Sequence, residues 1–77
     1  MILATFYSHY GAMLTKKKLG TACTLRPVPR SLSSSCGTCA CIEGIGPETV
    51  RAVAGETLEA VYSVSDDGSY SVLFRQD

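Results

Sequence analysis

The chain opens with a stretch of alternating side chains, ILATFYS, over residues 2–8. Both sides of the alternation are largely apolar, which is typical of a strand in the interior of a sheet. Ser8 is suited to cap a helix over the residues that follow, and Gly20 is suited to end it. Lysines at 16–18 would lie in its last turn, where cations interact favourably with the helix dipole. This part of the chain therefore predicts a strand followed by a helix.

A second strand is predicted over residues 21–28, TACTLRPV, in which Cys23 and Leu25 share one face. Pro27 and Pro29 end this strand, because proline has no N–H to donate to the ladder of a sheet. A polar loop follows.

The third predicted strand is TCACIEGI, residues 38–45. Successive side chains of a strand point to opposite faces, so Ala40 and Ile42 lie on one side and Cys39 and Cys41 on the other. Because a free cysteine packs as a small hydrophobe, burial is the simplest role for these two thiols.

A second helix is predicted to begin at Pro47 and to end at Gly55. Proline suits the first helical position, and Glu48 places an acid in the first turn. Three apolar side chains follow at the spacing of a buried stripe: Val50, Val53 and Ala54.

The last segment predicts a β-hairpin, in which residues 58–65 and 69–75 flank the sequence Asp66-Asp67-Gly68. A three-residue loop with Gly68 in the left-handed conformation matches the faces of the two strands better than a two-residue loop does. The three-residue loop predicts the pairs Val64–Tyr70, Tyr62–Val72 and Ala60–Phe74.

The order of these elements predicts one α+β domain over residues 1–77. We expect a ferredoxin-like βαββαβ sandwich with an extra C-terminal hairpin strand and with two helices on one face of an antiparallel sheet. The loop between the second and third strands would lie at one end of the sheet. The edge strand 69–76 could pair between subunits, so a homodimer is one expected assembly.

Composition and charge narrow the functional classes. The 77 residues include 7 basic and 7 acidic side chains, so the net charge is zero. Nucleic-acid binding is not expected, because it needs a basic surface that neutralises the phosphates, and a chain with zero net charge does not favour one. No apolar run reaches the roughly 20 residues of a membrane helix, and the N-terminus lacks the basic start of a secretory signal. We therefore expect no membrane partner and a cytoplasmic location, where thiols stay reduced.

Three of the four cysteines lie in the segment 36–41. Cys36 follows serines and precedes Gly37, so we expect an exposed thiol. Loop N–H groups and hydroxyls, with Arg30 and Arg26, could lower its pKa and make it nucleophilic. Such a thiol can hold sulfur or selenium and release it to a second thiol. The alternative is an unreactive cysteine in an ordinary turn.

The remaining thiols leave alternatives open. Cys36 and Cys39 have C-x-x-C spacing, so Cys39 is a candidate resolving thiol, and Cys41 adds a third sulfur. These three with Cys23 or His9 would supply four soft ligands, enough for zinc. The zinc signal is weak, because a second C-x-x-C or a paired histidine motif is lacking. We therefore assign no metal ligand and expect no cofactor.

Two segments carry a resemblance to a known family: ATFYSHYGAM at residues 4–13 and RPVPRSLSSSCG at residues 26–37. They resemble small bacterial domains grouped as selenium/sulfur carrier-like proteins, over roughly residues 1–45. The resemblance implies that Cys36 carries the sulfur or selenium, and the other motif positions fall on Pro27, Pro29, Arg30 and Gly37. The chain departs from the family in the two cysteines after Cys36 and in the final strand.

The sequence thus predicts a carrier or binding protein rather than an enzyme. In this reading Cys36 holds sulfur or selenium, as a persulfide or selenenyl sulfide, and Arg30 stabilises the anionic form. The expected partners are the proteins that donate and accept the atom. A dithiol redox or thiolate metal-binding module using Cys36, Cys39 and Cys41 is the alternative, and an interaction module with inert thiols is the third possibility.

Overall fold

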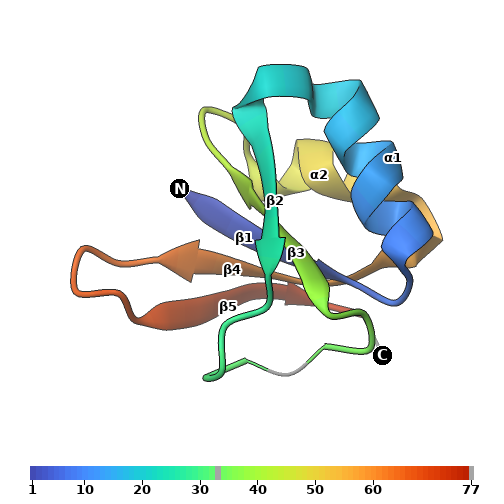
Figure 1. Cartoon of the computed structure of the whole chain (residues 1–77). Coiled ribbons are helices and arrows are strands. Elements are labelled where there is room, and N and C mark those ends of the chain that lie inside the picture. Colours follow the sequence, from blue (N-terminus) through green and yellow to red (C-terminus); the bar gives the residue numbers. More distant parts are fainter. Residues whose placement is uncertain (33, 77) are drawn as a thin grey trace.

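A computed structural model describes residues 1–32 and 34–76 of the chain as an α+β fold (Figure 1). In chain order the elements are β1 (Ile2–Phe6), α1 (His9–Leu19), β2 (Cys23–Pro27), β3 (Thr38–Ile42), α2 (Pro47–Ala54), β4 (Leu58–Val64) and β5 (Tyr70–Arg75). A short 3-10 turn follows each helix. None of the helices in the described part of the chain has the length and apolar character needed to span a membrane.

The helix ends follow the sequence signals. Ser8 occupies the N-cap position of α1 in an extended conformation, although its side chain makes no capping hydrogen bond. Both helices end at glycines with positive φ, Gly20 at 62° and Gly55 at 56°, a conformation that other residues adopt with strain. The Lys16 ammonium donates hydrogen bonds to the carbonyls of Gly20 and Cys23, at 3.1 and 2.6 Å, and so ties the end of α1 to β2.

The five strands form one antiparallel sheet in the order β2-β3-β1-β4-β5. β1 lies in the middle, which agrees with the apolar residues on both of its sides. Figure 1 shows the β2–β3 loop at the same end of the sheet as the link between β1 and α1. The predicted α+β class and antiparallel sheet are confirmed, and the ferredoxin-like arrangement stays a prediction.

Alternation along the strands divides the buried side chains between two clusters on opposite faces of the sheet. The first, here called the helix-side cluster, takes residues from both helices: Ala4, Phe6, Ala12, Cys23, Ala40, Ile42, Val50, Ala54, Leu58 and Val61. The second, the loop-side cluster, is smaller: Leu3, Cys39, Ala60 and Tyr62, with Val28, Leu32, Cys41, Val64 and Tyr70 packed against it. The predicted division of the β3 side chains between two faces is therefore confirmed.

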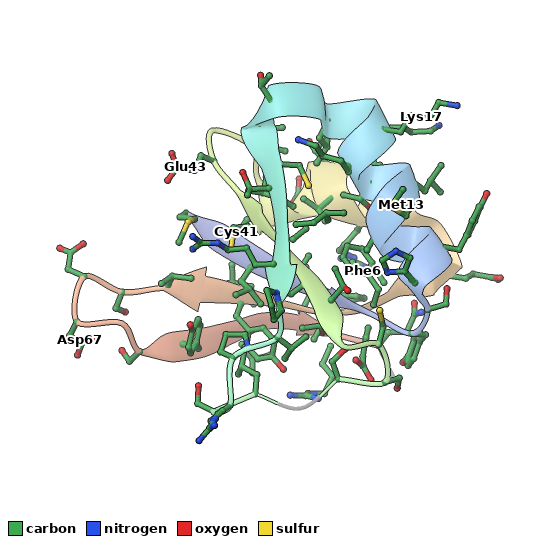
Figure 2. The ribbon with its side chains drawn as sticks, viewed as in Figure 1. Phe6, Met13, Lys17, Cys41, Glu43 and Asp67 are labelled. Atoms are coloured by element: carbon green, nitrogen blue, oxygen red, sulfur yellow. The ribbon has the colours of Figure 1, made fainter. Side chains whose placement is uncertain are left out.

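The β4–β5 hairpin has the predicted three-residue loop, with Gly68 at φ 86°. The Ser65 N–H donates to the Ser69 carbonyl at 2.9 Å and closes the loop. The Asp67 carboxylate accepts hydrogen bonds from the N–H and hydroxyl of Ser69, and these bonds lower the pKa of Asp67. Figure 2 shows Asp67 at the tip of the hairpin. The predicted pairs Val64–Tyr70 and Tyr62–Val72 are both present.

The third predicted hairpin pair, Ala60 with Phe74, is wrong. A register shift between Val61 and Tyr62 places Phe74 opposite Val61. Phe74 therefore packs against the helix-side cluster, where the Arg51 guanidinium lies 4.0 Å from the centre of its ring. An extra residue in one strand reverses the facing of the side chains beyond it, and strict alternation cannot reveal it.

Candidate functional site

The β2–β3 loop, which carries Cys36, is anchored at its base by backbone hydrogen bonds. The Val28 N–H donates to the Gly37 carbonyl at 3.0 Å, which extends the β2–β3 pairing beyond Pro27. The Leu32 N–H donates to the Pro29 carbonyl at the same distance and forms a turn. With φ fixed at both prolines, this part of the loop has few conformations available to it.

Further along the loop, serine side chains tie the segment before Cys36 to the sheet. The Ser34 hydroxyl donates to the Phe6 carbonyl at 3.2 Å and accepts the Cys36 N–H at 3.3 Å. The Glu59 carboxylate of β4 accepts two more hydrogen bonds, from the Ser35 N–H at 3.2 Å and the Ser35 hydroxyl at 3.0 Å. The loop is therefore folded back onto the ends of β1 and β4.

The expectation that Cys36 is exposed is wrong, because only 8% of the residue is accessible. The contacts of Ser34 and Ser35 explain the difference: a polar loop that hydrogen-bonds to the sheet buries the residue next to it. Among the described residues, neither apolar cluster includes Cys36. Its burial accompanies the hydrogen bonds that fold the loop back onto the sheet.

Two of the other thiols are poor nucleophiles at neutral pH. Cys39, which is 1% exposed, has its pKa raised to about 11 by burial and by the neighbouring Cys41 thiol, against a smaller opposing effect of Arg26. Its Sγ–H donates to the Pro27 carbonyl at 3.6 Å. Burial also raises the pKa of Cys23, which belongs to the helix-side cluster. Because the thiolate is the reactive form, both residues are held in the unreactive state.

A pocket of about 470 Å³ opens on the loop side of the sheet. It is lined by Met1, Leu3, Arg26, Pro27, Val28, Pro29, Arg30, Cys39, Cys41, Val64 and Tyr70. The structure thus brings the predicted residue Arg30 together with Cys39 and Cys41. Cys36 is not among the lining residues, and the predicted action of Arg30 on Cys36 stays a prediction.

The sequence alone does not decide whether the thiols bind a metal ion. In residues 1–32 and 34–76, no group of three or more histidine, cysteine or acidic side chains is arranged to hold a metal ion. All four cysteines are free thiols, with no disulfide among them. The metal-binding alternative therefore rests on the spacing in the sequence alone.

Comparison with known families matches residues 1–62 to the family described as "Putative Se/S carrier protein-like". The chain belongs to this family. Searches of curated proteins and of solved structures each found no match.

The Se/S carrier-like match extends beyond the region in which the sequence resemblance was strongest. It runs from the start of β1 into β4 and includes the whole Cys36 loop, α2 and all four cysteines. β5 lies outside the matched range, which agrees with the interpretation of the last strand as an addition to the family domain.

The hydrogen bonds between Glu59 and Ser35 were not predicted from the sequence. They join residues 24 positions apart and depend on how the loop folds over the sheet. One signal was available, since Glu59 is the single charged residue in the β4 sequence LEAVYSV. A charge in an otherwise apolar strand usually has a specific partner.

Proposed function

We propose that the protein is a sulfur/selenium carrier that holds the atom on Cys36, as a persulfide or a selenenyl sulfide. Family membership over a range that includes the Cys36 loop is the observation that carries the proposal. The position of Cys36 supports it, because the other three cysteines lie on β2 and β3. A thiol on a loop can reach a partner protein by a local movement that leaves the hydrogen bonds of the sheet intact.

The proposed carrier has a ferredoxin-like fold with an added strand. The order of elements from β1 to β4 and the sheet order β2-β3-β1-β4 agree with a βαββαβ sandwich. The helix-side cluster, to which both helices contribute, supports the placement of the two helices on one face. This arrangement leaves the β2–β3 loop at one end of the sheet, where a donor or acceptor protein can approach it.

Transfer to Cys36 needs no external oxidant. The Cys36 thiolate attacks the outer sulfur of a donor persulfide, a new S–S bond forms, and the donor leaves as a thiolate. The acceptor thiol removes the atom by the same exchange in reverse. Arg30, on the same loop, is the proposed cation for the anionic persulfide. Cys39 is the proposed resolving thiol only if its burial is relieved, because its pKa of about 11 disfavours attack.

The burial of Cys36 adds one requirement to the proposal. Because only 8% of the residue is accessible, the loop has to move before a protein partner can reach the sulfur. The hydrogen bonds of Ser35 to Glu59 and of Ser34 to the Phe6 carbonyl are the contacts that such a movement breaks. We place this exchange in the cytoplasm, where thiols remain reduced between transfers.

The test is to load the protein with a persulfide donor and to measure the sulfur that cyanide releases as thiocyanate. The wild type and the matched control Cys41→Ser should release about one equivalent, and Cys36→Ser should release none, as single-site thiol transfer requires. Equal release from the Cys36→Ser variant would overturn the proposal. Intrinsic tyrosine fluorescence on each variant shows that the fold is kept.

A further inference from the structure

The pocket on the loop side of the sheet is lined by Arg30 and Cys39 but not by Cys36. Its volume of about 470 Å³ falls within the usual range of small-molecule sites. Leu3, Val64 and Tyr70 give it apolar walls, and Tyr70 is held edge-on against Tyr62, with ring centres 6.5 Å apart. A rigid aromatic wall of this kind suits a flat apolar group.

The charges of the pocket have one sign. Arg26 and Arg30 line it, and none of the described residues that line it is acidic. Arg26 projects from β2, where it pairs with Cys39, and Arg30 comes from the loop beyond the two prolines. Two guanidinium groups on different segments can bind one carboxylate from two directions. The pocket therefore complements an anion that carries an apolar body.

Cys41 is the thiol that this pocket presents. It is partly exposed, whereas Cys39 beside it is 1% exposed. Cys41, Arg26 and Met1 also line an adjoining hollow of about 260 Å³, so Cys41 lies where the two spaces meet. Figure 2 shows its side chain between β2 and the N-terminal end of β1. A reactant in either space can approach its sulfur.

We propose that this pocket binds a small organic anion that contains a disulfide and an apolar body, and that Cys41 exchanges with it. The anion pairs with Arg26 and Arg30, and its apolar part packs on Tyr70. The Cys41 sulfur attacks the nearer sulfur of the ligand, a Cys41–S bond forms and the S–S bond of the ligand breaks. The second half of the ligand leaves as a thiol with the proton that Cys41 gives up. The disulfide is itself the oxidant, so the electrons balance.

The experiment compares two thiol reagents of similar shape, the anionic dithiobis(nitrobenzoate) and the neutral dithiodipyridine. Rates are followed by absorbance, and the modified cysteine is located by fragmentation mass spectrometry. We expect Cys41 to react first with the anionic reagent. Arg26→Gln and Arg30→Gln should each lower the anionic rate relative to the neutral rate by about tenfold, the usual weight of a charge-assisted hydrogen bond.

The matched control is Lys17→Gln, which removes one positive charge from the exposed surface of α1 (Figure 2). It should leave the ratio of the two rates within about twofold of the wild type, since the charge is remote and screened. Using a ratio cancels any general loosening of the fold, which would raise both rates together. An unchanged ratio in both arginine variants, or first modification at a cysteine other than Cys41, would overturn the proposal.

Two cysteine variants separate this reaction from the carrier function. Cys36→Ser should keep the fast anionic reaction at Cys41, and Cys41→Ser should lose it while still accepting sulfur from a persulfide donor. Loss of the fast anionic reaction in Cys36→Ser would contradict the assignment to Cys41.

Discussion

The helix-side and loop-side clusters are built from the same strands, but they differ in what covers them. Helices supply Ala12, Val50 and Ala54 to the first cluster. The second is covered in part by the β2–β3 loop, through Val28 and Leu32, and keeps an open pocket beside it. A pocket of about 400 Å³ also touches the edge of the helix-side cluster, at Leu58 and Phe74, so both clusters have a hollow beside them. The difference is that the loop-side pocket brings thiols and arginines together.

The largest expected effect is a difference in the free energy of unfolding between substitutions at two neighbouring positions of β3. These positions lie on different faces of the sheet. Ile42 is fully buried in the helix-side cluster, and Cys41 is partly exposed at the pocket. Ile42→Ala should lower the free energy of unfolding by about 3 kcal/mol, because it leaves a cavity that helices cannot fill. Cys41→Ala should cost less than about 1 kcal/mol. Urea denaturation measures both, and equal losses would remove the contrast between the faces.

The second expected effect is a dependence of stability on pH that comes from the buried thiol of Cys39. Its pKa rises from 9.0 to about 11 in the folded protein, so the folded state holds this proton more tightly than the unfolded chain does. The associated stability is complete below pH 9 and is lost as the pH rises through about 11. Across this window the wild type should lose about 2 kcal/mol more than Cys39→Ala does. The free energy of unfolding of both proteins is measured in urea at each pH. An equal change with pH in the two proteins would show that folding does not raise the pKa of Cys39.

A smaller effect tests whether Glu59 holds the Cys36 loop down. Glu59→Gln replaces a carboxylate that accepts two hydrogen bonds from Ser35 with a neutral amide. The loss of charge-assisted bonding is worth about 1 kcal/mol, so alkylation of Cys36 should become about fivefold faster. The matched control, Glu56→Gln, changes an exposed carboxylate that takes no part in these bonds. Equal rates of Cys36 alkylation in the two variants would show that the hydrogen bonds between Glu59 and Ser35 do not hold the loop against the sheet.

The smallest effect concerns the edge of the helix-side cluster. The Arg51 guanidinium lies over the Phe74 ring, and the register shift in the hairpin makes this contact possible. Arg51→Gln should lower the free energy of unfolding by about 0.5 kcal/mol, as expected for a cation on an aromatic face near solvent. Thermal unfolding of Arg51→Gln and of Phe74→Leu checks this, and a stabilised Arg51→Gln variant would count against the contact.

Much of the fold could be predicted because it is encoded locally. The alternation around Ala40 and Ile42, the glycines after each helix and the Gly68 turn each specify a nearby conformation, and the structure has all of them. The register shift that moves Phe74 escaped prediction, because a bulge is a property of two paired strands.

The candidate site was less predictable than the fold. Small polar residues around Cys36 indicated exposure, but Ser34 and Ser35 bond to Phe6 and Glu59, and these partners are distant in sequence. The same limit applies to Arg30, whose place in a pocket with Cys41 follows from how the loop folds over the sheet. Composition indicates which groups are available, and only the folded chain determines which of them meet.

The most direct test of the account is to find where a transferred sulfur resides. The protein is treated with a persulfide donor, its free thiols are blocked, and the peptide that contains Cys36, Cys39 and Cys41 is fragmented in a mass spectrometer. The account predicts the added sulfur on Cys36. An added sulfur found on Cys39 or Cys41, with Cys36 unmodified, would contradict it.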